Sequence, residues 1–467
     1  MGSADRDVSR VAIVGAGPSG LFAAQALVGQ SEVPVQVDLI DRLPCPYGLL
    51  RYGVAPDHTS IKSVANALAR TFDSDGVRFL GNVEFGRDVS RPDLLAAYDA
   101  VVYAAGASED AQLGVPGEGL PGSRSAREFV AWYSGHPDAP EQDLSGVRVA
   151  AVIGVGNVAV DVARVLAKTA ESLEVTDMPP GVLAELHRHH ADDIHVIARR
   201  GPHHAAFTTV ELRELVHTPG LQVTVNGDAF DGIPDDLDRR PKANVEILRE
   251  AAAKSVENPR RRLHFWFWRK PIAVEGDLRV EALVLERTRL DEAGKVVGTG
   301  ETQRLEAQLV LRSIGYRSVA LPGVPFDERA AVISNVEGRV VDAAGVVQPR
   351  EYVVGWIKRG PTGVIGTNKS DASQTVRHLV ADLVAARSEG SADSAAGATG
   401  GPAGDGDGGG RPDLAAALHS RGHDVVSLDG WRAIDAAEIA RGAALGRERT
   451  KLDSWPELMG ASHRIQD

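Results

Sequence analysis

The sequence predicts an α/β protein with two parallel sheets, each covered by helices. A glycine-rich motif occurs twice, at residues 15–20 and 154–159. Each copy follows a short apolar run of strand length, residues 11–14 and 149–153, and precedes a stretch rich in Ala, Leu and Val that favours a helix. Strand, glycine turn and helix in this order predict two Rossmann-like units in one chain.

The residues of the two motifs indicate what these turns bind. The first motif is Gly15, Ala16, Gly17, Pro18, Ser19 and Gly20, and the second is Gly154, Val155, Gly156, Asn157, Val158 and Ala159. The first two glycines permit a tight turn and let the backbone approach a pyrophosphate, while the small last residue keeps helix and strand close. The phosphates then lie at a helix N-terminus, where unpaired N–H groups favour negative charge. Two such motifs predict two dinucleotides held face to face.

Composition and charge narrow the class of protein. A chain of 467 residues suits two or three domains. It has no apolar run long enough to span a membrane, and its polar first ten residues leave no room for a signal peptide, so we expect a cytoplasmic protein without a membrane partner. The net charge of −13 argues against a nucleic-acid partner. Nothing in the sequence requires an oligomer, so we expect a monomer.

Cys45 is the single cysteine of the chain. One cysteine excludes a disulfide within the chain, a cysteine-ligated iron–sulfur cluster and a redox-active dithiol. We expect Cys45 to be packed in the interior. The histidines at 187, 189 and 190 are not spaced as a supported metal site and are expected to be solvated, so no metal is expected.

The ends of the second strands distinguish the two dinucleotides. Asp41 follows Gly20 by 21 residues, the spacing of a carboxylate that accepts a hydrogen bond from a ribose hydroxyl. Arg199 and Arg200 take the corresponding place in the second unit. A guanidinium pair favours a 2′-phosphate, so the second unit is predicted to bind NADP(H). The alternative is a solvated strand end.

The first unit is predicted to hold FAD, although its glycine motif alone does not separate FAD from NAD. NADPH needs a redox partner, and a second nicotinamide would be redundant. The chain returns near residues 356–365 to cap the first unit. Backbone N–H groups of Gly363, Val364 and Ile365 are then placed to reach the N1/O2 edge of a flavin.

These observations predict two domains. Residues 1–108 plus 319–467 form a discontinuous FAD-binding domain, and residues 109–318 form the NADP-binding domain. A helix is expected at 373–386 and a helical extension from 414 to the C-terminus. The Gly/Ser/Asp-rich segment 388–411 is predicted to be flexible. Residues 271–308 alternate apolar and charged residues, which favours antiparallel strands outside the second sheet.

Several long stretches resemble the adrenodoxin-reductase-type ferredoxin–NADP+ reductases, in particular their bacterial members. The matching stretches are residues 46–58, 154–157, 160–164, 198–202, 206–215 and 355–367. They are far more specific than glycines alone and span most of the chain, while segment 388–411 departs from the family pattern. The resemblance implies a glutathione-reductase-like architecture with two Rossmann-like domains, for FAD and for NADP.

The resemblance also implies binding residues, position by position. For FAD these are Gly15 to Gly20, Asp41, Leu49, Phe85, Trp356, Gly363, Val364 and Ile365. For NADP they are Gly154, Val155, Gly156, Asn157, Arg199, Arg200, Glu211 and Gly363. Phe85 departs from the family, which tends to place an aliphatic residue there.

Three further residues match polar positions near the reacting rings. His58 and Glu214 match residues close to the flavin and the nicotinamide, and Asp161 matches an acidic position nearby. The resemblance implies that a hydride passes from nicotinamide C4 to flavin N5 and that the protein chiefly aligns the rings. His58 either relays a proton at the flavin edge or is a structural histidine. Glu214 either orients the carboxamide or lies on a solvated helix face, and Asp161 is either part of the site or a helix-face carboxylate.

Because the chain lacks a cysteine pair that could accept electrons from the reduced flavin, a one-electron carrier is the natural acceptor. The resemblance implies an acidic ferredoxin. A basic stretch runs from residue 239 to 270, and we expect docking around Arg239, Arg240 and Arg249 ahead of Arg260 to Arg262. The alternative is a solvated helix followed by a buried aromatic strand.

The sequence therefore predicts an enzyme, a flavoprotein that transfers electrons between NADPH and ferredoxin through FAD. The main alternative is an NADPH diaphorase or a flavin monooxygenase with a small-molecule acceptor. A non-catalytic NADP-binding scaffold or redox sensor is the alternative from another class. A pyridine-nucleotide disulfide reductase would need a cysteine pair that this chain lacks.

Overall fold

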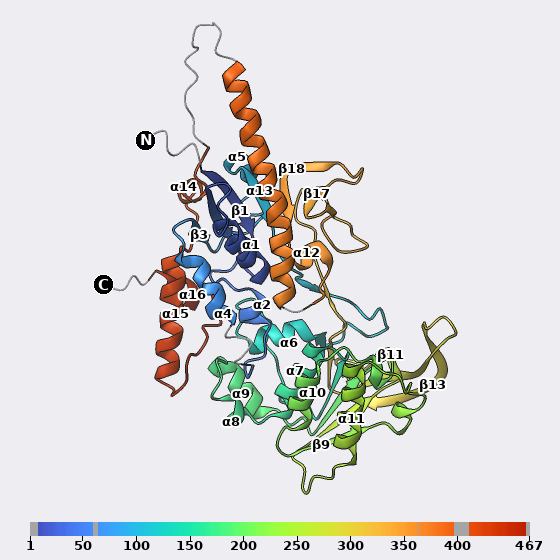
Figure 1. Cartoon of the computed structure of the whole chain (residues 1–467). Helices are drawn as coiled ribbons and strands as arrows, with labels where there is room; N and C mark the ends of the chain where they lie inside the picture. The colour runs from blue at the N-terminus through green and yellow to red at the C-terminus, as the bar shows by residue number, and fades with distance from the viewer. Residues whose placement is uncertain (1–7, 59–63, 364, 397–410, 464–467) are drawn as a thin grey trace.

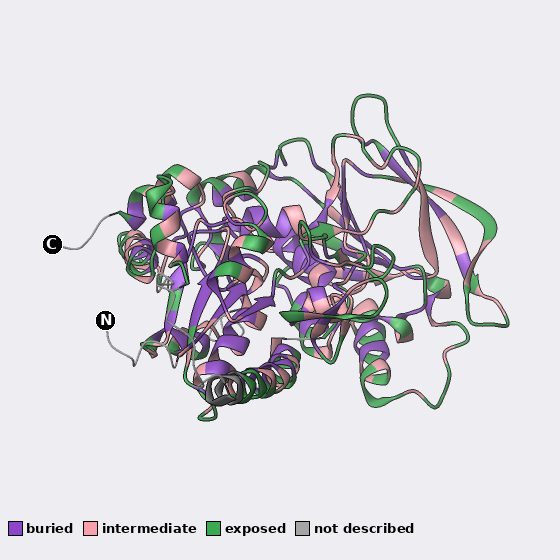
Figure 2. Ribbon diagram, turned by 90° about the horizontal axis from the view of Figure 1, so that it is seen from above, coloured by how far each residue is buried: buried purple, intermediate pink, exposed green. Residues whose placement is uncertain are grey.

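A computed structural model describes residues 8–58, 64–363, 365–396 and 411–463 of the chain (Figure 1). Its strands form two large sheets, as predicted. Buried residues gather along these sheets and on the helix faces turned toward them, while exposed residues occupy the outer loops (Figure 2).

The first sheet has seven strands in the order β16-β17-β18-β4-β1-β2-β3. Strands β1 to β4, together with β18, pair in parallel, and β16 to β18 form antiparallel pairs. The strands are β1 (Ser9–Val14), β2 (Val35–Ile40), β3 (Val77–Leu80), β4 (Ala100–Tyr103), β16 (Asn335–Val336), β17 (Arg339–Val341) and β18 (Val347–Val353). The chain after residue 330 therefore returns to the first sheet.

Helices cover both faces of this sheet. Alternate residues of β1 enter opposite cores: Val11 and Ile13 lie in one hydrophobic cluster, and Ala12 and Val14 in another. The helices of this part are α1 (Pro18–Val28), α2 (Leu49–Tyr52), α4 (Val64–Ala69), α5 (Arg91–Ala97), α12 (Trp356–Arg359), α13 (Ile365–Ala396), α14 (Leu414–Ser420), α15 (Leu428–Ala443) and α16 (Trp455–Ser462). Helix α13 packs along α1 (Figure 1).

The second sheet has six parallel strands in the order β6-β14-β7-β8-β10-β9. They are β6 (Ser123–Ser125), β7 (Val149–Ile153), β8 (Asp193–Ile197), β9 (Leu221–Val225), β10 (Arg261–Trp266) and β14 (Leu309–Arg312). The helices of this part are α6 (Ala126–Tyr133), α7 (Asn157–Ala167), α8 (Ala170–Leu173), α9 (Pro180–Arg188), α10 (Thr209–Val216) and α11 (Arg239–Ala253).

Smaller sheets complete the architecture. Strands β11 (Arg269–Glu275), β12 (Ala282–Leu290) and β13 (Val296–Glu306) form an antiparallel sheet, as expected for 271–308. Strands β5 (Glu109–Asp110) and β15 (Tyr316–Arg317) pair with each other, so the two passages of the chain between the large sheets lie side by side. The division into 1–108 plus 319–467 and 109–318 stays a prediction, which this pairing supports.

Three local expectations can be compared with the structure. Helix α13 continues to Ala396, so the first part of segment 388–411, predicted to be flexible, is helical; Ala and Glu residues there sustain a helix already begun. Residues 397–410 lie outside the described residues. Cys45 is fully buried, as expected, and burial raises the pKa of its thiol to about 12.

The histidines after α9 were expected to be solvated, and for His189 this is wrong. His187 and His190 are exposed, but His189 is 4% exposed. The guanidinium of Arg261 lies 2.9 Å from His189 Nε2 and also donates to the carbonyl of Leu166, so the turn after α9 folds onto the end of α7. Burial, with the nearby charge of Arg261, lowers the pKa of His189 to about 3.

No helix in the described parts of the chain combines the length and the hydrophobicity needed to cross a membrane.

Candidate dinucleotide sites and the cluster between them

The first glycine turn joins β1 to α1, and its three glycines have different structural roles. Gly15 has φ +111°, and a Cβ there would lie 2.5 Å from the carbonyl oxygen of Ala104. A Cβ on Gly20 would lie 1.9 Å from the carbonyl oxygen of Gly15, so helix and turn touch. Gly17 precedes α1, and a Cβ there would meet only Gly48, at 3.9 Å. Folding therefore requires glycine at 15 and 20, whereas position 17 leaves room for a ligand to approach the backbone.

Asp41 lies directly beside this turn. Its Oδ2 accepts a hydrogen bond from the N–H of Ala16 at 2.8 Å, and its Oδ1 accepts from the N–H of Leu43 at 2.9 Å. Burial raises the pKa of Asp41, against the opposing effect of these two hydrogen bonds. Each carboxylate oxygen keeps a second lone pair, so the group retains capacity to accept from a ribose hydroxyl.

The segment around Leu49 forms the other wall of the turn. The N–H of Tyr47 donates to the carbonyl of Ala16 at 2.8 Å, and a Cβ on Gly48 would lie 3.1 Å from Gly17 Cα. Leu49 begins α2 next to this contact and is partly exposed. Phe85 lies at the far side of the sheet end, where its ring meets the ring of Tyr103 edge-on at 5.8 Å.

The returning chain also reaches the first turn. A Cβ on Gly355, which has φ +78°, would lie 2.2 Å from Ser19 Oγ, and the N–H of Gly355 donates to Asp371 Oδ2 at 2.6 Å. Trp356 begins α12, and its ring lies 5.5 Å from that of Tyr316. Gly363 is exposed with φ +84°, and Ile365 begins α13. Val364, predicted to donate to the flavin, lies outside the described residues.

The second glycine turn repeats this design between β7 and α7. Gly154 has φ +130°, and a Cβ there would lie 2.0 Å from the carbonyl oxygen of Ser313. Gly156 precedes α7, and no atom lies within 4 Å of the position of its Cβ. Hydrogen bonds from residues 206–208 fix the residues on either side of Gly156. Asn157 Oδ1 accepts from the N–H of Thr208 at 2.8 Å, and the carbonyl of Val155 accepts from the N–H groups of Ala206 and Phe207. The open face of Gly156 fits the approach of a pyrophosphate.

Arg199 and Arg200 follow β8 and are both exposed. Within the described residues, neither guanidinium makes a hydrogen bond or an ion pair with another side chain. Their backbone is fixed, because the carbonyl of Arg199 accepts from Thr288 Oγ1 at 2.9 Å and the carbonyl of Arg200 accepts from the N–H of Trp268 at 3.2 Å. Two uncommitted guanidiniums on a fixed backbone fit a 2′-phosphate.

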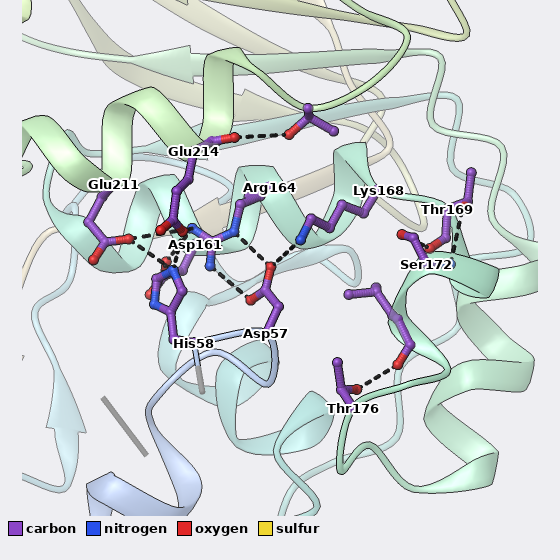
Figure 3. A network of polar contacts seen from close by, with 12 residues as sticks. Asp57, His58, Asp161, Arg164, Lys168, Thr169, Ser172, Thr176, Glu211 and Glu214 are labelled. Atoms are coloured by element: carbon purple, nitrogen blue, oxygen red, sulfur yellow. Dashed lines mark hydrogen bonds and ion pairs between the residues drawn. The ribbon is translucent and has the colours of Figure 1, made fainter. Parts of the chain in front are cut away.

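His58 lies where the two large sheets approach each other, and it brings three of the predicted acidic residues together. Its Nε2 lies 2.8 Å from Glu214 Oε2 and 3.0 Å from Glu211 Oε2, and its Nδ1 lies 3.8 Å from Asp161 Oδ1. Figure 3 shows side chains of α7 and α10 converging on the loop that carries His58. His58, Asp161 and Glu211 are buried, whereas the Glu214 side chain is half-exposed.

A second layer of charge holds this cluster. Arg164, 1% exposed, donates to both carboxylate oxygens of Asp57 at 2.9 Å, and its Nη1 lies 2.8 Å from Asp161 Oδ1. Lys168 reaches Asp57 Oδ2 at 2.6 Å. Asp57 and His58 belong to the loop after α2, Arg164 lies in α7 and Lys168 directly follows that helix, so these ion pairs cross between the two proposed domains (Figure 3).

The charges shift the pKa values of the cluster in opposite directions. Burial raises the pKa of Asp161 to about 6, although the charges of Arg164 and His58 oppose this. Burial lowers the pKa of His58, but its hydrogen bond to Glu211 and the charge of Asp161 more than offset that effect and raise the pKa above its usual value. Burial also acts against ionised Asp57, yet Arg164 and Lys168 hold its pKa well below the usual range. These shifts favour a protonated His58 and make Asp161 easier to protonate than an ordinary aspartate.

Ligand atoms of His58, Asp161 and Glu211 all lie within 4.8 Å of one another, a spacing that the sequence-based expectation of no metal did not foresee. Arg164 Nη1, 2.8 Å from Asp161 and 3.5 Å from Glu211, supplies positive charge at the same point. This guanidinium opposes a bound cation by like-charge repulsion.

Sequence reasoning assigned no role to Asp57, Arg164 or Lys168. Asp57 and Arg164 lie inside the stretches that carry the family resemblance, at 46–58 and 160–164. The signal that could have identified Arg164 is its i,i+3 spacing from Asp161 on one helix face. Glu211 was predicted to contact NADP, and the structure places it against His58.

The basic stretch divides into free and paired halves. Arg239, Arg240 and Arg249 are exposed on α11, with the Arg249 guanidinium 5.2 Å from the centre of the Phe230 ring. In contrast, Arg262 pairs with Asp193 at 2.5 Å, Arg269 with Asp228 at 3.2 Å and Lys270 with Glu286 at 2.8 Å.

Comparison with known proteins gives this geometry a context. Residues 9–202 match the family described as pyridine nucleotide-disulphide oxidoreductase. The chain is 43% identical over 463 residues to NADPH-ferredoxin reductase FprA of Mycobacterium tuberculosis, covering 96% of this chain and 98% of that protein. It is 38% identical to the mitochondrial NADPH:adrenodoxin oxidoreductase of Arabidopsis thaliana, over 97% of this chain and 95% of that protein.

A solved structure agrees. FprA of M. tuberculosis in complex with NADPH matches with a TM-score of 0.87 and 42% identity, over 97% of this chain and 99% of that one. The fold class and the family resemblance inferred from the sequence are both confirmed. The chain belongs to the adrenodoxin-reductase-type ferredoxin–NADP+ reductases, within the pyridine nucleotide-disulphide oxidoreductase family.

Proposed function

We propose that this chain transfers electrons between NADPH and ferredoxin through FAD. The observation that carries the proposal is a pair of glycine turns in two proposed domains that meet at His58. Asp41 lies beside the first turn, and Arg199 and Arg200 follow the second strand of the other unit. Relatives named NADPH-ferredoxin reductase match this chain along nearly its whole length.

The residues present fit both cofactors. The opening at Gly17, walled by Gly48 and Asp41, would hold the pyrophosphate and ribose of FAD, with Leu49, Phe85, Trp356 and Gly363 around the remainder. The opening at Gly156 would hold the pyrophosphate of NADP(H), and the exposed guanidiniums of Arg199 and Arg200 would hold its 2′-phosphate. FAD accepts a hydride from the nicotinamide and releases electrons singly, which suits an iron–sulfur acceptor.

The chain's own residues would hold the two proposed domains in position and handle protons at the site between them. The Asp57–Arg164–Lys168 ion pairs hold the His58 loop against α7, and thereby fix the approach of the two proposed domains. His58 and Asp161 hold a proton in a buried site, and the half-exposed Glu214 connects that site to solvent. We assign proton handling to this cluster rather than a purely structural role, because His58, Asp161 and Glu211 lie together in a buried site and burial raises the pKa of Asp161 to about 6.

For the partner, we propose an acidic ferredoxin that docks on α11 around Arg239, Arg240 and Arg249. These guanidiniums are exposed and make no ion pair within the described residues, whereas Arg262, Arg269 and Lys270 are already paired. We propose that the enzyme acts as a cytoplasmic monomer.

The test is anaerobic mixing of the purified flavoprotein with NADPH or NADH, followed by addition of oxidised ferredoxin. We expect NADPH to bleach the flavin band with a preference of about a hundredfold over NADH, because two charge-assisted hydrogen bonds recognise the 2′-phosphate. Ferredoxin should then be reduced. Protein without flavin, or equal rates with NADH and NADPH, would refute the proposal. Rapid reduction of dyes without any reduction of ferredoxin would favour a diaphorase.

A further inference from the structure

Three aromatic rings lie beside the arginine pair, and no role has been assigned to any of them. Trp268 follows β10, and His203 and His204 follow Arg200 in the short turn Pro202–His204. The two imidazole rings lie 4.0 Å apart, and their centres lie 6.3 Å and 6.0 Å from that of the indole. The rings form one cluster at the ends of two neighbouring strands, β8 and β10.

Trp268 is held firmly in an uncommon conformation. Its φ is +57°, in the left-handed region that bulky residues avoid. The N–H of Trp268 donates to the carbonyl of Arg200, and its carbonyl accepts from the N–H of Thr288 at 2.9 Å. The indole packs on Gly201, where a Cβ would lie 2.7 Å from the ring. Side chains held in strained backbone often clamp ligands.

The rings of this cluster are uncharged at neutral pH. Burial, together with His204, lowers the pKa of His203 to about 4, and burial with the charge of Arg200 lowers the pKa of His204. His204 is exposed, and Trp268 is half-buried. The cluster therefore offers neutral aromatic faces next to two guanidinium charges.

Neutral aromatic rings beside two guanidiniums suit the half of NADP(H) that carries the adenine and the 2′-phosphate. Ligands of parallel α/β sheets bind outside the carboxyl ends of the strands, and the residues after the second strand reach the ribose. The adenine is attached to the same ribose that carries the 2′-phosphate, so it lies next to whatever binds that phosphate. Aromatic side chains bind bases by stacking.

We propose that Trp268, supported by His203 and His204, is the surface on which the adenine of NADP(H) stacks, an inference that rests on the proposed function. Trp268 binds the base, and Arg199 and Arg200 bind the 2′-phosphate. The two contributions are separable, because 5′-AMP carries the base without the 2′-phosphate.

The test measures binding of adenosine 2′,5′-bisphosphate and of 5′-AMP to the FAD-loaded protein by calorimetry. Trp268→Asn removes the ring but tolerates the left-handed backbone. It should weaken both ligands by the same factor, about tenfold, because loss of stacking does not depend on the phosphate. Trp268→Phe should bind both nearly as wild type does. Trp266→Phe is the matched control, because its indole donates to His195 at 2.8 Å instead.

A second measurement uses only the conservative variants. Binding of the bisphosphate should change the indole fluorescence of wild type and of Trp266→Phe, and this change should be absent in Trp268→Phe. Unchanged affinities in Trp268→Asn, or a fluorescence change that persists in Trp268→Phe, would overturn the inference while leaving the proposed function intact. Loss of bisphosphate affinity alone would also overturn it, since Trp268 would then act through the arginines. Wild-type protein that binds neither ligand would refute the proposed function as well.

Discussion

At the scale of single residues, the cluster around His58 balances burial against charge. Three carboxylates lie within 4 Å of one imidazole, and the positive charge of the buried Arg164 offsets their mutual repulsion. Arg164 is already committed to Asp57 through two hydrogen bonds, so it neutralises Asp161 only partly. The result is an aspartate whose pKa is about 6 in the folded protein.

Asp161→Asn tests this balance through the pH dependence of stability. A folded-state pKa raised above its usual value means that the folded protein holds the proton more tightly than the unfolded chain, so ionisation of Asp161 destabilises the fold. This penalty grows as pH rises from about 4 and is complete above about 6, where it amounts to about 3 kcal/mol. The unfolding free energy of the wild type, relative to that of Asp161→Asn, should fall by that amount over this range in urea titrations.

The exposed Asp192, which pairs with Arg148, provides the control for this prediction. Asp192→Asn removes an exposed carboxylate and supplies the reference profile. If the unfolding free energies of Asp161→Asn and the wild type differ by the same amount at every pH, the pKa of Asp161 is not raised in the folded protein.

A residue of the site could be predicted from the sequence when its partners lie nearby in the sequence, and could not when they lie far away. Asp41 and the arginine pair were predictable because a strand and a glycine motif fix their position locally. Asp57 and Lys168 were not predictable, because their contact joins residues 111 apart in the sequence, in two proposed domains. Trp268 was grouped with a basic docking stretch, because no sequence pattern indicates the left-handed backbone that brings its ring to Arg200.

At the scale of elements, the two strand–turn–helix units contain glycines of two kinds. Gly15 and Gly154 have positive φ and would drive a Cβ into a carbonyl oxygen, whereas Gly17 and Gly156 have space around them. The fold requires the first kind, and the second kind leaves the space that we propose the dinucleotides use. A sequence motif does not distinguish the two, although it predicted both units.

Gly154→Ala and Gly156→Ala separate these roles. Gly156→Ala should keep the wild-type Tm and its FAD, because no atom lies within 4 Å of the new methyl and the backbone, at φ −96°, accepts alanine. Its affinity for NADP+ should fall by about tenfold or more, since the methyl keeps the pyrophosphate from charge-assisted hydrogen bonds.

Gly154→Ala should instead lower the Tm, because its Cβ would lie 2.0 Å from a backbone oxygen. Calorimetric titration and thermal unfolding measure the two effects. Wild-type NADP+ affinity in Gly156→Ala would show that the dinucleotide does not approach this turn.

Element boundaries and strand order were less predictable than the elements themselves. Helix α13 extends beyond its expected end at 386, because helices propagate through weakly favourable residues once begun. Strands β16 and β17 are only two and three residues long and have no periodicity to detect. The placement of β10 between β8 and β9 is a tertiary choice that local patterns do not encode.

At the scale of the whole molecule, the C-terminal extension fastens the two proposed domains together. Lys451 is 2% exposed and donates to the carbonyls of Arg51 at 2.6 Å and Ser134 at 2.9 Å, and it lies 3.4 Å from Asp177. Arg51 belongs to the first proposed domain, and Ser134 and Asp177 belong to the second. The side chain of Arg51 pairs in turn with the buried Glu438 of α15.

Lys451→Met should therefore destabilise the protein by about 3–5 kcal/mol, because it removes a buried ammonium group that two backbone carbonyls and the partly buried Asp177 carboxylate contact. Lys295→Met, at an exposed hairpin turn, removes the same charge and should change little. Denaturant unfolding of the two variants measures the difference. Equal stabilities would mean that water replaces the ammonium group and that the extension does not hold the domains.

The charge distribution of the whole chain governs the last prediction. On a protein of net charge −13, free cations on α11 create a local field of opposite sign, which steers an acidic partner and repels it elsewhere. Replacing Arg239, Arg240 and Arg249 by Gln should lower the second-order rate of ferredoxin reduction by about tenfold at low salt and flatten its dependence on ionic strength. Flavin reduction by NADPH should keep its rate, because we propose that it takes place at the His58 cluster and not on α11. Arg262→Gln is the control, since Asp193 already neutralises that guanidinium. A salt dependence that survives the triple substitution would place the docking surface elsewhere, because a steered encounter loses its sensitivity to salt when the steering charges are removed.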